Sequence, residues 1–167
     1  MTKSEELSQI ALKAGEILRG RGWRLATVES CTGGWVWQVG TALAGRSGWV
    51  WGGPGTFSNA TQATPVGGPG SVISSYGAVS GEVAEAMVSG ALERTDASVA
   101  VSVTGIAGPG GGSEEKPVGT VYMAWQFPGG VAASERFHFH GDREEVRRQS
   151  VTTALLELAR RAEAIPD

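Results

Sequence analysis

The chain has 167 residues, a formal net charge of −3, an apolar share of 41% and one cysteine, which indicate a domain-sized protein of ordinary composition. The acidic balance excludes broad nucleic-acid binding, which needs a surplus of cationic side chains, and no apolar run is long enough to span a membrane. The lone cysteine, Cys31, excludes an intramolecular disulfide, and together with the absence of a secretory signal this predicts a cytoplasmic protein.

The first predicted element is a helix over residues 4–19. Its apolar residues recur at helical spacing, and Ser4 is the expected N-cap, with glycines from Gly20 onward ending the helix. A short strand over 24–28 follows. The next residues, Glu-Ser-Cys-Thr-Gly-Gly, form a turn that is expected to open a second helix reaching about Leu43.

Residues 45–76 give no clear element. Gly-Gly-Pro-Gly occurs twice there, at 52–55 and 67–70, and proline removes a donor from any strand ladder. Glycine accounts for 26 of the 167 residues, and it is clustered without a period. Such clusters indicate tight turns or backbone that approaches a ligand closely.

The second half of the chain is more regular. Ser80 is the expected N-cap of a helix, and an apolar strand is predicted over 97–103. Two further strands, 119–127 and 131–140, are joined by a Pro-Gly-Gly turn and so form an antiparallel pair. A last helix begins after Gly141 or Asp142, with glutamates early and arginines late.

This order of helices and strands predicts the fold class. Alternating helices and strands with one hairpin favour an α/β protein. We expect a single three-layer α/β/α domain over residues 1–167, with a mixed, mostly parallel sheet.

The turn over residues 30–34 is the first candidate site. Ser30, Cys31 and Thr32 stand at the predicted start of a helix, where unpaired N–H groups favour negative charge. Gly33 and Gly34 leave room for a ligand. The turn either binds phosphate or holds an oxyanion beside a nucleophilic Ser30, unless it is an ordinary helix cap. For Cys31 we favour a small buried side chain over a nucleophile.

The loop over residues 104–112 is the second candidate. It leaves the carboxyl end of a buried strand, where open α/β sheets bind ligands, and six of its nine residues are glycine or proline. It lacks the Gly-Lys-Ser/Thr of a phosphate-binding P-loop. A long crossover without a ligand is an equally good interpretation.

A cluster of arginines at the start of the last helix is the third candidate. Arg143 and Arg147 lie one helical turn apart and are able to clamp a phosphate, although arginines among glutamates commonly form a solvated, salt-bridged face. His138 and His140 share a strand face, but no further ligand set completes a metal site, so no metal is predicted.

Five motifs occur in order along the chain: Glu-Ser-Cys-Thr-Gly-Gly (29–34), Gly-Ala-Val-Ser (77–80), Thr-Gly-Ile-Ala-Gly-Pro-Gly-Gly-Gly (104–112), Glu-Lys-Pro-Val-Gly-Thr-Val (115–121) and Gly-Asp-Arg (141–143). Each is weak alone, but together they resemble the CinA C-terminal family over residues 4–160. This family contains nicotinamide mononucleotide deamidases, so the resemblance implies hydrolysis of that carboxamide to nicotinic acid mononucleotide and ammonia.

The resemblance also implies the roles of individual residues. It implies a serine nucleophile, Ser30, activated by a lysine, with no metal or cofactor and with a small mononucleotide as the bound partner. The residues that it implies for substrate binding are Thr32, Gly33, Gly34, Asn59, Thr104, Gly105, Gly108, Gly110 and one of Arg143 and Arg147.

Two catalytic positions depart from the family pattern. The family has Thr-Tyr-Ser-Asn-x-x-Lys where this chain has Thr-Phe-Ser-Asn-Ala-Thr-Gln, so Phe57 replaces the tyrosine and Gln62 replaces the lysine. A neutral amide cannot accept the serine proton, and losing a general base costs roughly 10²–10⁴-fold in rate. Lys116 is an alternative base, although the sequence does not place it near Ser30.

Three functional hypotheses follow. The chain is an amidohydrolase, a catalytically impaired nucleotide-binding domain of the same fold, or a structural domain that binds a protein partner. The third hypothesis rests on six tryptophans, which supply either an interface or a core. A homo-oligomer is expected from the resemblance and from this density of tryptophan.

Overall fold

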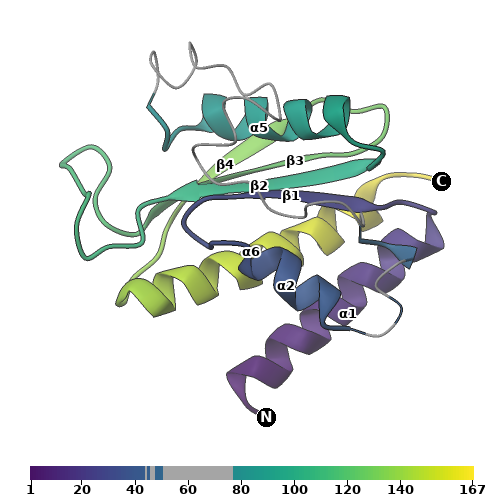
Figure 1. The fold of residues 1–167 in the computed structure, drawn as a ribbon, viewed down its shortest axis with the longest axis horizontal. Helices are drawn as coiled ribbons and strands as arrows, with labels where there is room; N and C mark the ends of the chain where they lie inside the picture. The colour runs from purple at the N-terminus through teal and green to yellow at the C-terminus, as the bar shows by residue number, and fades with distance from the viewer. Residues whose placement is uncertain (44, 46–47, 51–76) are drawn as a thin grey trace.

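The computed structural model describes residues 1–43, 45, 48–50 and 77–167 (Figure 1). Phe57, Asn59 and Gln62 therefore lie outside the described residues. The elements in chain order are α1 (Lys3–Gly20), β1 (Leu25–Glu29), α2 (Trp35–Thr41), α5 (Gly81–Arg94), β2 (Val99–Gly105), β3 (Thr120–Gln126), β4 (Ala133–His138) and α6 (Arg143–Ala164).

The four described strands form one mixed sheet in the order β1-β2-β3-β4. β1 pairs with β2 in parallel, whereas β2 with β3 and β3 with β4 pair antiparallel. The predicted mixed sheet is confirmed, but the expected parallel majority is wrong for these strands. Two consecutive strands can pair in parallel only if the chain between them crosses over the sheet, as it does between β1 and β2. The connection from β2 to β3 contains no helix over residues 106–119, so the chain reverses beside β2.

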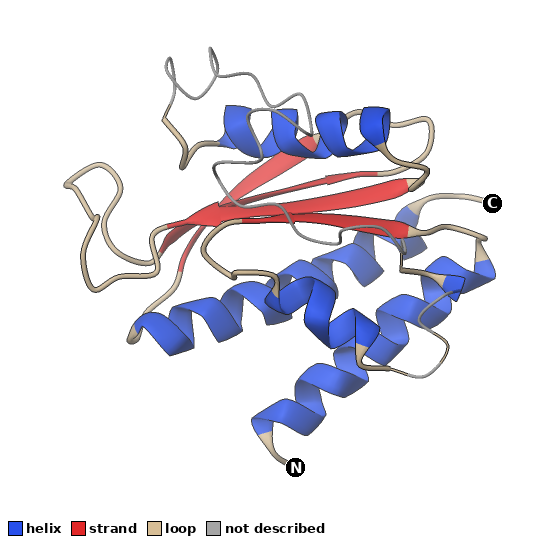
Figure 2. Cartoon of the chain, in the orientation of Figure 1, coloured by secondary structure: helices blue, strands red, loops and turns tan. Residues whose placement is uncertain are grey.

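The sheet lies between two layers of helices, as predicted for a three-layer protein. Figure 2 shows α5 on one face and α1, α2 and α6 on the other. Each face has its own apolar cluster: Ala26 and Ala100 pack with Met87 of α5, while Val101 packs with Leu155 of α6. Successive strand residues point to opposite faces, so a strand covered on both sides reads as a continuous apolar run.

Two of the four described helices begin at capping residues that the sequence identifies. Ser80 caps α5 through Val83 N at 3.2 Å, and Asp142 caps α6 through Glu145 N at 2.9 Å. Ser4 as the cap of α1 is wrong. Thr2 accepts from Glu5 N at 3.1 Å and its own N–H donates to the Glu5 carboxylate, which forms a reciprocal capping box.

Trp49 fixes α1 and α2 against β1. Its side chain is buried, and its carbonyl accepts from Leu25 N at 2.7 Å. A Cβ at Gly15 of α1 would lie 2.5 Å from Trp49 Cε2, and one at Gly40 of α2 would lie 3.1 Å from Cη2. The two glycines therefore make room for the indole, which belongs to the core and not to an interface.

No helix in the described part of the chain combines the length and apolar character needed to cross a membrane.

Candidate functional site

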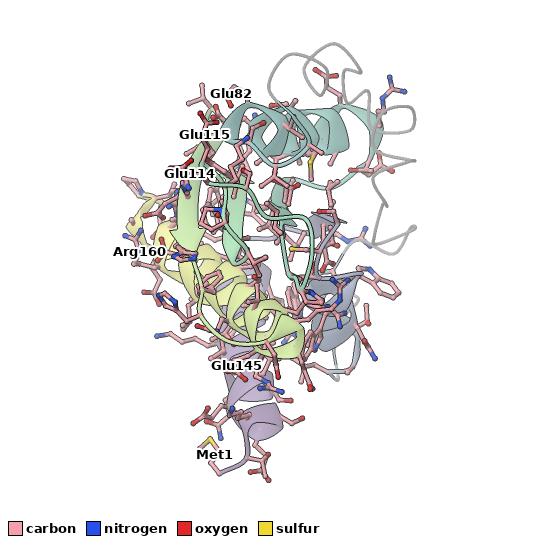
Figure 3. All side chains as sticks on the ribbon, turned by 90° about the vertical axis from the view of Figure 1, so that its left-hand side faces the viewer. Met1, Glu82, Glu114, Glu115, Glu145 and Arg160 are labelled. Carbon is pink, nitrogen blue, oxygen red and sulfur yellow. The ribbon has the colours of Figure 1, made fainter. Side chains whose placement is uncertain are left out.

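Three of the segments singled out in the sequence meet at the carboxyl ends of β1 and β2. Because these strands are parallel and Glu29 pairs with Val103, the turn after β1 and the loop after β2 begin side by side. The start of α6 joins them at the left-hand end of the sheet in Figure 1. Figure 3 looks onto this end, with Glu114 and Glu115 of the loop labelled above Glu145 of α6.

Glu29 is a buried carboxylate beneath the turn, with 1% of its surface exposed. Its Oε1 accepts from Thr32 Oγ1 at 2.7 Å and from Val36 N at 2.9 Å, and its Oε2 accepts from Trp37 N at 3.1 Å. The N-cap position of α2, Gly34, has no side chain to do this. Glu29 therefore caps α2 from the preceding strand.

Burial raises the pKa of the Glu29 carboxyl, and hydrogen bonds from Thr32 and from the α2 backbone oppose that rise. These bonds all donate to the carboxylate, and the helix dipole also favours its charge. The amides of Val36 and Trp37 are thus occupied. The hypothesis that phosphate binds the open N–H groups at the start of α2 is wrong for these two donors.

The second predicted helix is also shorter than expected, because it begins at Trp35. Gly33 and Gly34 have φ angles of +61° and +92°, which are outside the right-handed helical region. Gly33 N donates to Ser30 O at 3.1 Å and so closes a tight turn. The residues that precede α2 are therefore a rigid connection that presents Ser30.

Ser30 is half-buried at the start of this turn. Its backbone N–H donates to the Val103 carbonyl at 3.0 Å, and its Oγ lies 3.3 Å from the same oxygen. The hydroxyl is thereby anchored to the neighbouring strand by a long and weak hydrogen bond. Of the described turn residues, Thr32 and Gly33 line the adjacent pocket, and Ser30 does not.

The surroundings of Cys31 disfavour the ionised form of its thiol. Burial, with a smaller contribution from the Glu29 carboxylate, raises the pKa of its thiol to about 11, although the guanidinium of Arg147 opposes the rise. The thiolate is the reactive form of cysteine, and at neutral pH it is scarcely populated here. The raised pKa argues against a nucleophilic role, but the side chain is half-buried and not fully buried as predicted.

Arg147 of α6 binds the backbone of the turn. Its Nε donates to the Cys31 carbonyl at 3.0 Å and its Nη2 to the Thr32 carbonyl at 3.1 Å. Its guanidinium also lies 5.4 Å from the centroid of the Trp35 ring, within the range of a cation–π contact.

The neighbouring arginines have different partners. Arg143 is exposed, and its Nη1 donates to the Gly108 carbonyl at 2.8 Å. Arg148 forms ion pairs with Glu144 and Glu145 at 3.3 and 2.7 Å, as expected for a solvated, salt-bridged face. The three cations of this helix start thus have distinct roles.

A pocket of about 470 Å³ opens in front of the turn. Its lining residues are Thr32, Gly33, Trp35, Gln38, Arg143, Glu144 and Arg147. A larger cavity of about 610 Å³ lies on the seam between α1 and α6, and none of the predicted site residues lines it. We regard the smaller pocket as the candidate site because the turn and both arginines meet there.

The predicted loop residues are placed in two ways. The buried Thr104 hydroxyl donates to the Ala78 carbonyl at 2.7 Å, and Gly105 pairs with Val121 within the sheet, so both belong to the base of the loop. Gly108 contacts Arg143, and Gly110 is exposed farther along.

Lys116, the alternative base, donates from Nζ to the Val79 carbonyl. This bond attaches the loop to the segment that precedes α5.

Within the described ranges, no group of three or more His, Cys, Asp or Glu side chains is placed to hold a metal ion. The rings of His138 and His140 lie 4.7 Å apart, and His138 Nε2 lies 3.2 Å from the Val118 carbonyl oxygen.

Sequence reasoning missed four residues of this site: Glu29, Trp35, Gln38 and Glu144. Glu29 directly precedes Ser30, and a carboxylate at the end of an apolar strand is the signal that was available. Trp35 is one of the six tryptophans, for which the sequence suggests either an interface or a core. Gln38 lies in the first turn of α2, and nothing in the sequence around it indicates a site residue.

Residues 7–162 match the family described as the CinA C-terminal domain. The chain belongs to this family. Its relatives include the nicotinamide-nucleotide amidohydrolase PncC of Escherichia coli K12, which is 47% identical over 155 residues that cover 93% of each chain. The protein of the same name from Pseudomonas putida is 46% identical over 151 residues, covering 90% of this chain and 94% of the relative.

A solved CinA structure confirms the fold. The competence/damage inducible protein CihA from Agrobacterium tumefaciens superposes with a TM-score of 0.86 at 35% identity, covering 94% of this chain and 95% of that one. Family membership and the α/β fold, both predicted from the sequence, are therefore confirmed.

Proposed function

We propose that this chain is a nicotinamide mononucleotide amidohydrolase whose turnover is slowed by Phe57 and Gln62. The observation that carries the proposal is the convergence of the Ser30 turn with Arg143 and Arg147 on one pocket. The names of its E. coli and P. putida relatives, both nicotinamide-nucleotide amidohydrolases, support this substrate class.

The proposed reaction is a metal-independent serine hydrolysis in two steps. Ser30 Oγ forms a bond to the carboxamide carbon, the C–N bond breaks, and ammonia leaves with the proton that the serine hydroxyl gave up. Water then attacks the acyl ester, which releases nicotinic acid mononucleotide and restores the hydroxyl. Both steps need a group that accepts a proton, and the amide of Gln62 cannot do so near neutral pH.

We assign the substrate phosphate to Arg143. Arg147 already commits Nε and Nη2 to the two carbonyls of the turn. Arg143 is more exposed, lines the pocket, and gives one Nη1 donor to Gly108, which leaves further donors of its guanidinium to face a ligand. This assignment selects one of the two arginines that the sequence left as alternatives.

The second candidate function is nucleotide binding without turnover, and Gln62 is the observation that favours it. Binding of the substrate phosphate by the arginines does not require a base at position 62, whereas removal of the Ser30 proton does. The two functions make different predictions for the same set of variants.

The test is ammonia release from nicotinamide mononucleotide by the chain, by Ser30→Ala and by the double variant Phe57→Tyr/Gln62→Lys. Under the main proposal the chain releases ammonia slowly, Ser30→Ala abolishes release, and the double variant raises it by roughly 10²-fold or more. Release by the double variant alone would favour the second candidate.

Calorimetric titration with nicotinamide mononucleotide tests binding independently of turnover. Arg143→Gln is expected to weaken binding by about tenfold or more, because a charged hydrogen bond to phosphate is lost. Arg148→Gln is the matched control on the same helix and should bind as the parent does. Absence of binding by the folded parent at millimolar ligand would overturn both candidates.

A further inference from the structure

The turn that carries Ser30 is held from two sides by charged side chains. Glu29 lies beneath it and accepts from one hydroxyl and two backbone amides. Arg147 reaches it from α6 and donates to two consecutive carbonyls. Thr32 is bound by both, through its hydroxyl on one side and its carbonyl on the other.

These contacts restrict where the Ser30 oxygen can lie. The backbone of Ser30 is flanked by Glu29 and by the Cys31 carbonyl that Arg147 binds, and its own amide is bonded to Val103. With the backbone fixed on both sides, the hydroxyl can move only by rotation about χ1, and its bond to the Val103 carbonyl restricts that rotation. A displacement of about 1 Å at a reacting atom can cost on the order of 10²-fold in rate.

We propose that Glu29 and Arg147 are a pair of positioning residues that clamp the turn and hold the Ser30 hydroxyl in its attacking position. This inference rests on the proposed function for its kinetic consequence, but the clamp itself is a property of the turn.

The two side chains suit this task for different reasons. The Glu29 carboxylate is an acceptor at every lone pair, so it can satisfy two amides and a hydroxyl at once. Glutamine in its place would point an NH₂ group at the N–H of Val36 or Trp37. The fork of Arg147 spans two neighbouring carbonyls, which a lysine ammonium cannot do with the same geometry.

The first test follows Cys31, the sole cysteine of the chain, and requires no catalytic activity. Its alkylation by iodoacetamide is measured as a function of pH, so that the ionisation of the thiol in each variant is taken from its own rate profile. Each rate is divided by the fraction of thiolate, so that it reports how accessible the half-buried thiol is to the reagent. Loss of a charged hydrogen bond is expected to raise this corrected rate by about tenfold.

The variants for this test are Glu29→Gln and Arg147→Gln, with Arg148→Gln as the matched control. Glu29→Gln should also shift the alkylation profile to lower pH, because the carboxylate contributes to the raised pKa of Cys31. Arg147→Gln should increase the corrected rate even though loss of the cation by itself would move the profile to higher pH. An unchanged corrected rate in folded Arg147→Gln would overturn the clamp.

The second test measures nicotinamide mononucleotide hydrolysis in the Phe57→Tyr/Gln62→Lys background. Arg147→Gln is expected to lower kcat by about 10²-fold with little change in KM, because it displaces the nucleophile and not the substrate. Arg147→Lys should recover only a small part of this loss. A rise in KM with kcat unchanged would overturn the positioning role and assign Arg147 to substrate binding.

The two tests separate failure of the clamp from failure of the proposed function. An inactive background with faster alkylation in the clamp variants would refute the amidohydrolase assignment and support the clamp as a property of the turn. Should Glu29→Gln fail to fold, Arg147→Gln alone decides the outcome, because Arg147 lies at the surface of the turn and not in the core.

Discussion

The two connections at the carboxyl end of the sheet are built in opposite ways. The turn over residues 30–34 is short and bound by Glu29, Val103 and Arg147. The loop over residues 106–118 is long and exposed along much of its length, and it is attached at separate points, such as the bond from Arg143 to Gly108.

This difference indicates a division of labour. A nucleophile reacts faster when a rigid backbone keeps its reacting atom in one position, and the turn is a rigid backbone of this kind. A surface that surrounds a ligand fits it better when its backbone can adjust to the shape of the ligand, and a glycine-rich loop can do so. Both are rich in glycine, so composition alone does not distinguish the rigid connection from the adaptable one.

The largest expected effect is on the carboxylate beneath the turn. Glu29→Ala leaves two buried amides and a hydroxyl without an acceptor, so it should lower the free energy of unfolding by about 3 kcal/mol or more. Glu114→Ala in the exposed loop should stay within about 0.5 kcal/mol of the parent. Urea unfolding followed by tryptophan fluorescence measures both, and similar losses would break the comparison.

A smaller effect is expected from adding one methyl group to each connection. Gly33 has a φ of +61°, so Gly33→Ala should cost about 1–2 kcal/mol in backbone strain. Gly110 has open space around the position of a Cβ and no positive φ, so Gly110→Ala should be neutral or stabilising by up to about 1 kcal/mol. Thermal unfolding of the two variants tests this, and a destabilised Gly110→Ala would show that the loop is as constrained as the turn.

The most subtle expected effect is a change in the pH dependence of stability. Because the Glu29 pKa is raised above its ordinary value of 4.5, the native state keeps this proton over a range in which the unfolded chain has lost it. The stabilising contribution is therefore present below pH 4.5 and is lost as the pH rises through the native pKa. Glu29→Gln should remove this part of the slope. Urea unfolding over a pH series measures it, and an unchanged slope would contradict the assignment to Glu29.

Much of the fold follows from local patterns. The apolar run of β2, the hairpin of β3 and β4, and the caps Ser80 and Asp142 are readable because each depends on neighbouring residues. Thr2 was also readable, since a threonine with a glutamate three residues later is the signature of a capping box.

The features that sequence reasoning missed depend on contacts between distant segments. No local pattern shows that Glu29 would cap a helix that begins six residues later in the chain, or that Arg147 would bind the turn from α6. The antiparallel direction of β3 depends on a connection without a helix. The motifs identified Ser30 as a candidate nucleophile, while the geometry around it required the tertiary structure.

The exposed strand β4 has a consequence for how the chain behaves at high concentration. It lies at the end of the described strand order, and Glu135, Arg136 and His138 face solvent along it. Unpaired strand edges recruit other strands into aggregates, and charged side chains on an edge are a common protection against this. Within the described residues no strand lies beyond β4, and we expect its charged side chains to oppose the pairing of a strand from another molecule at this edge.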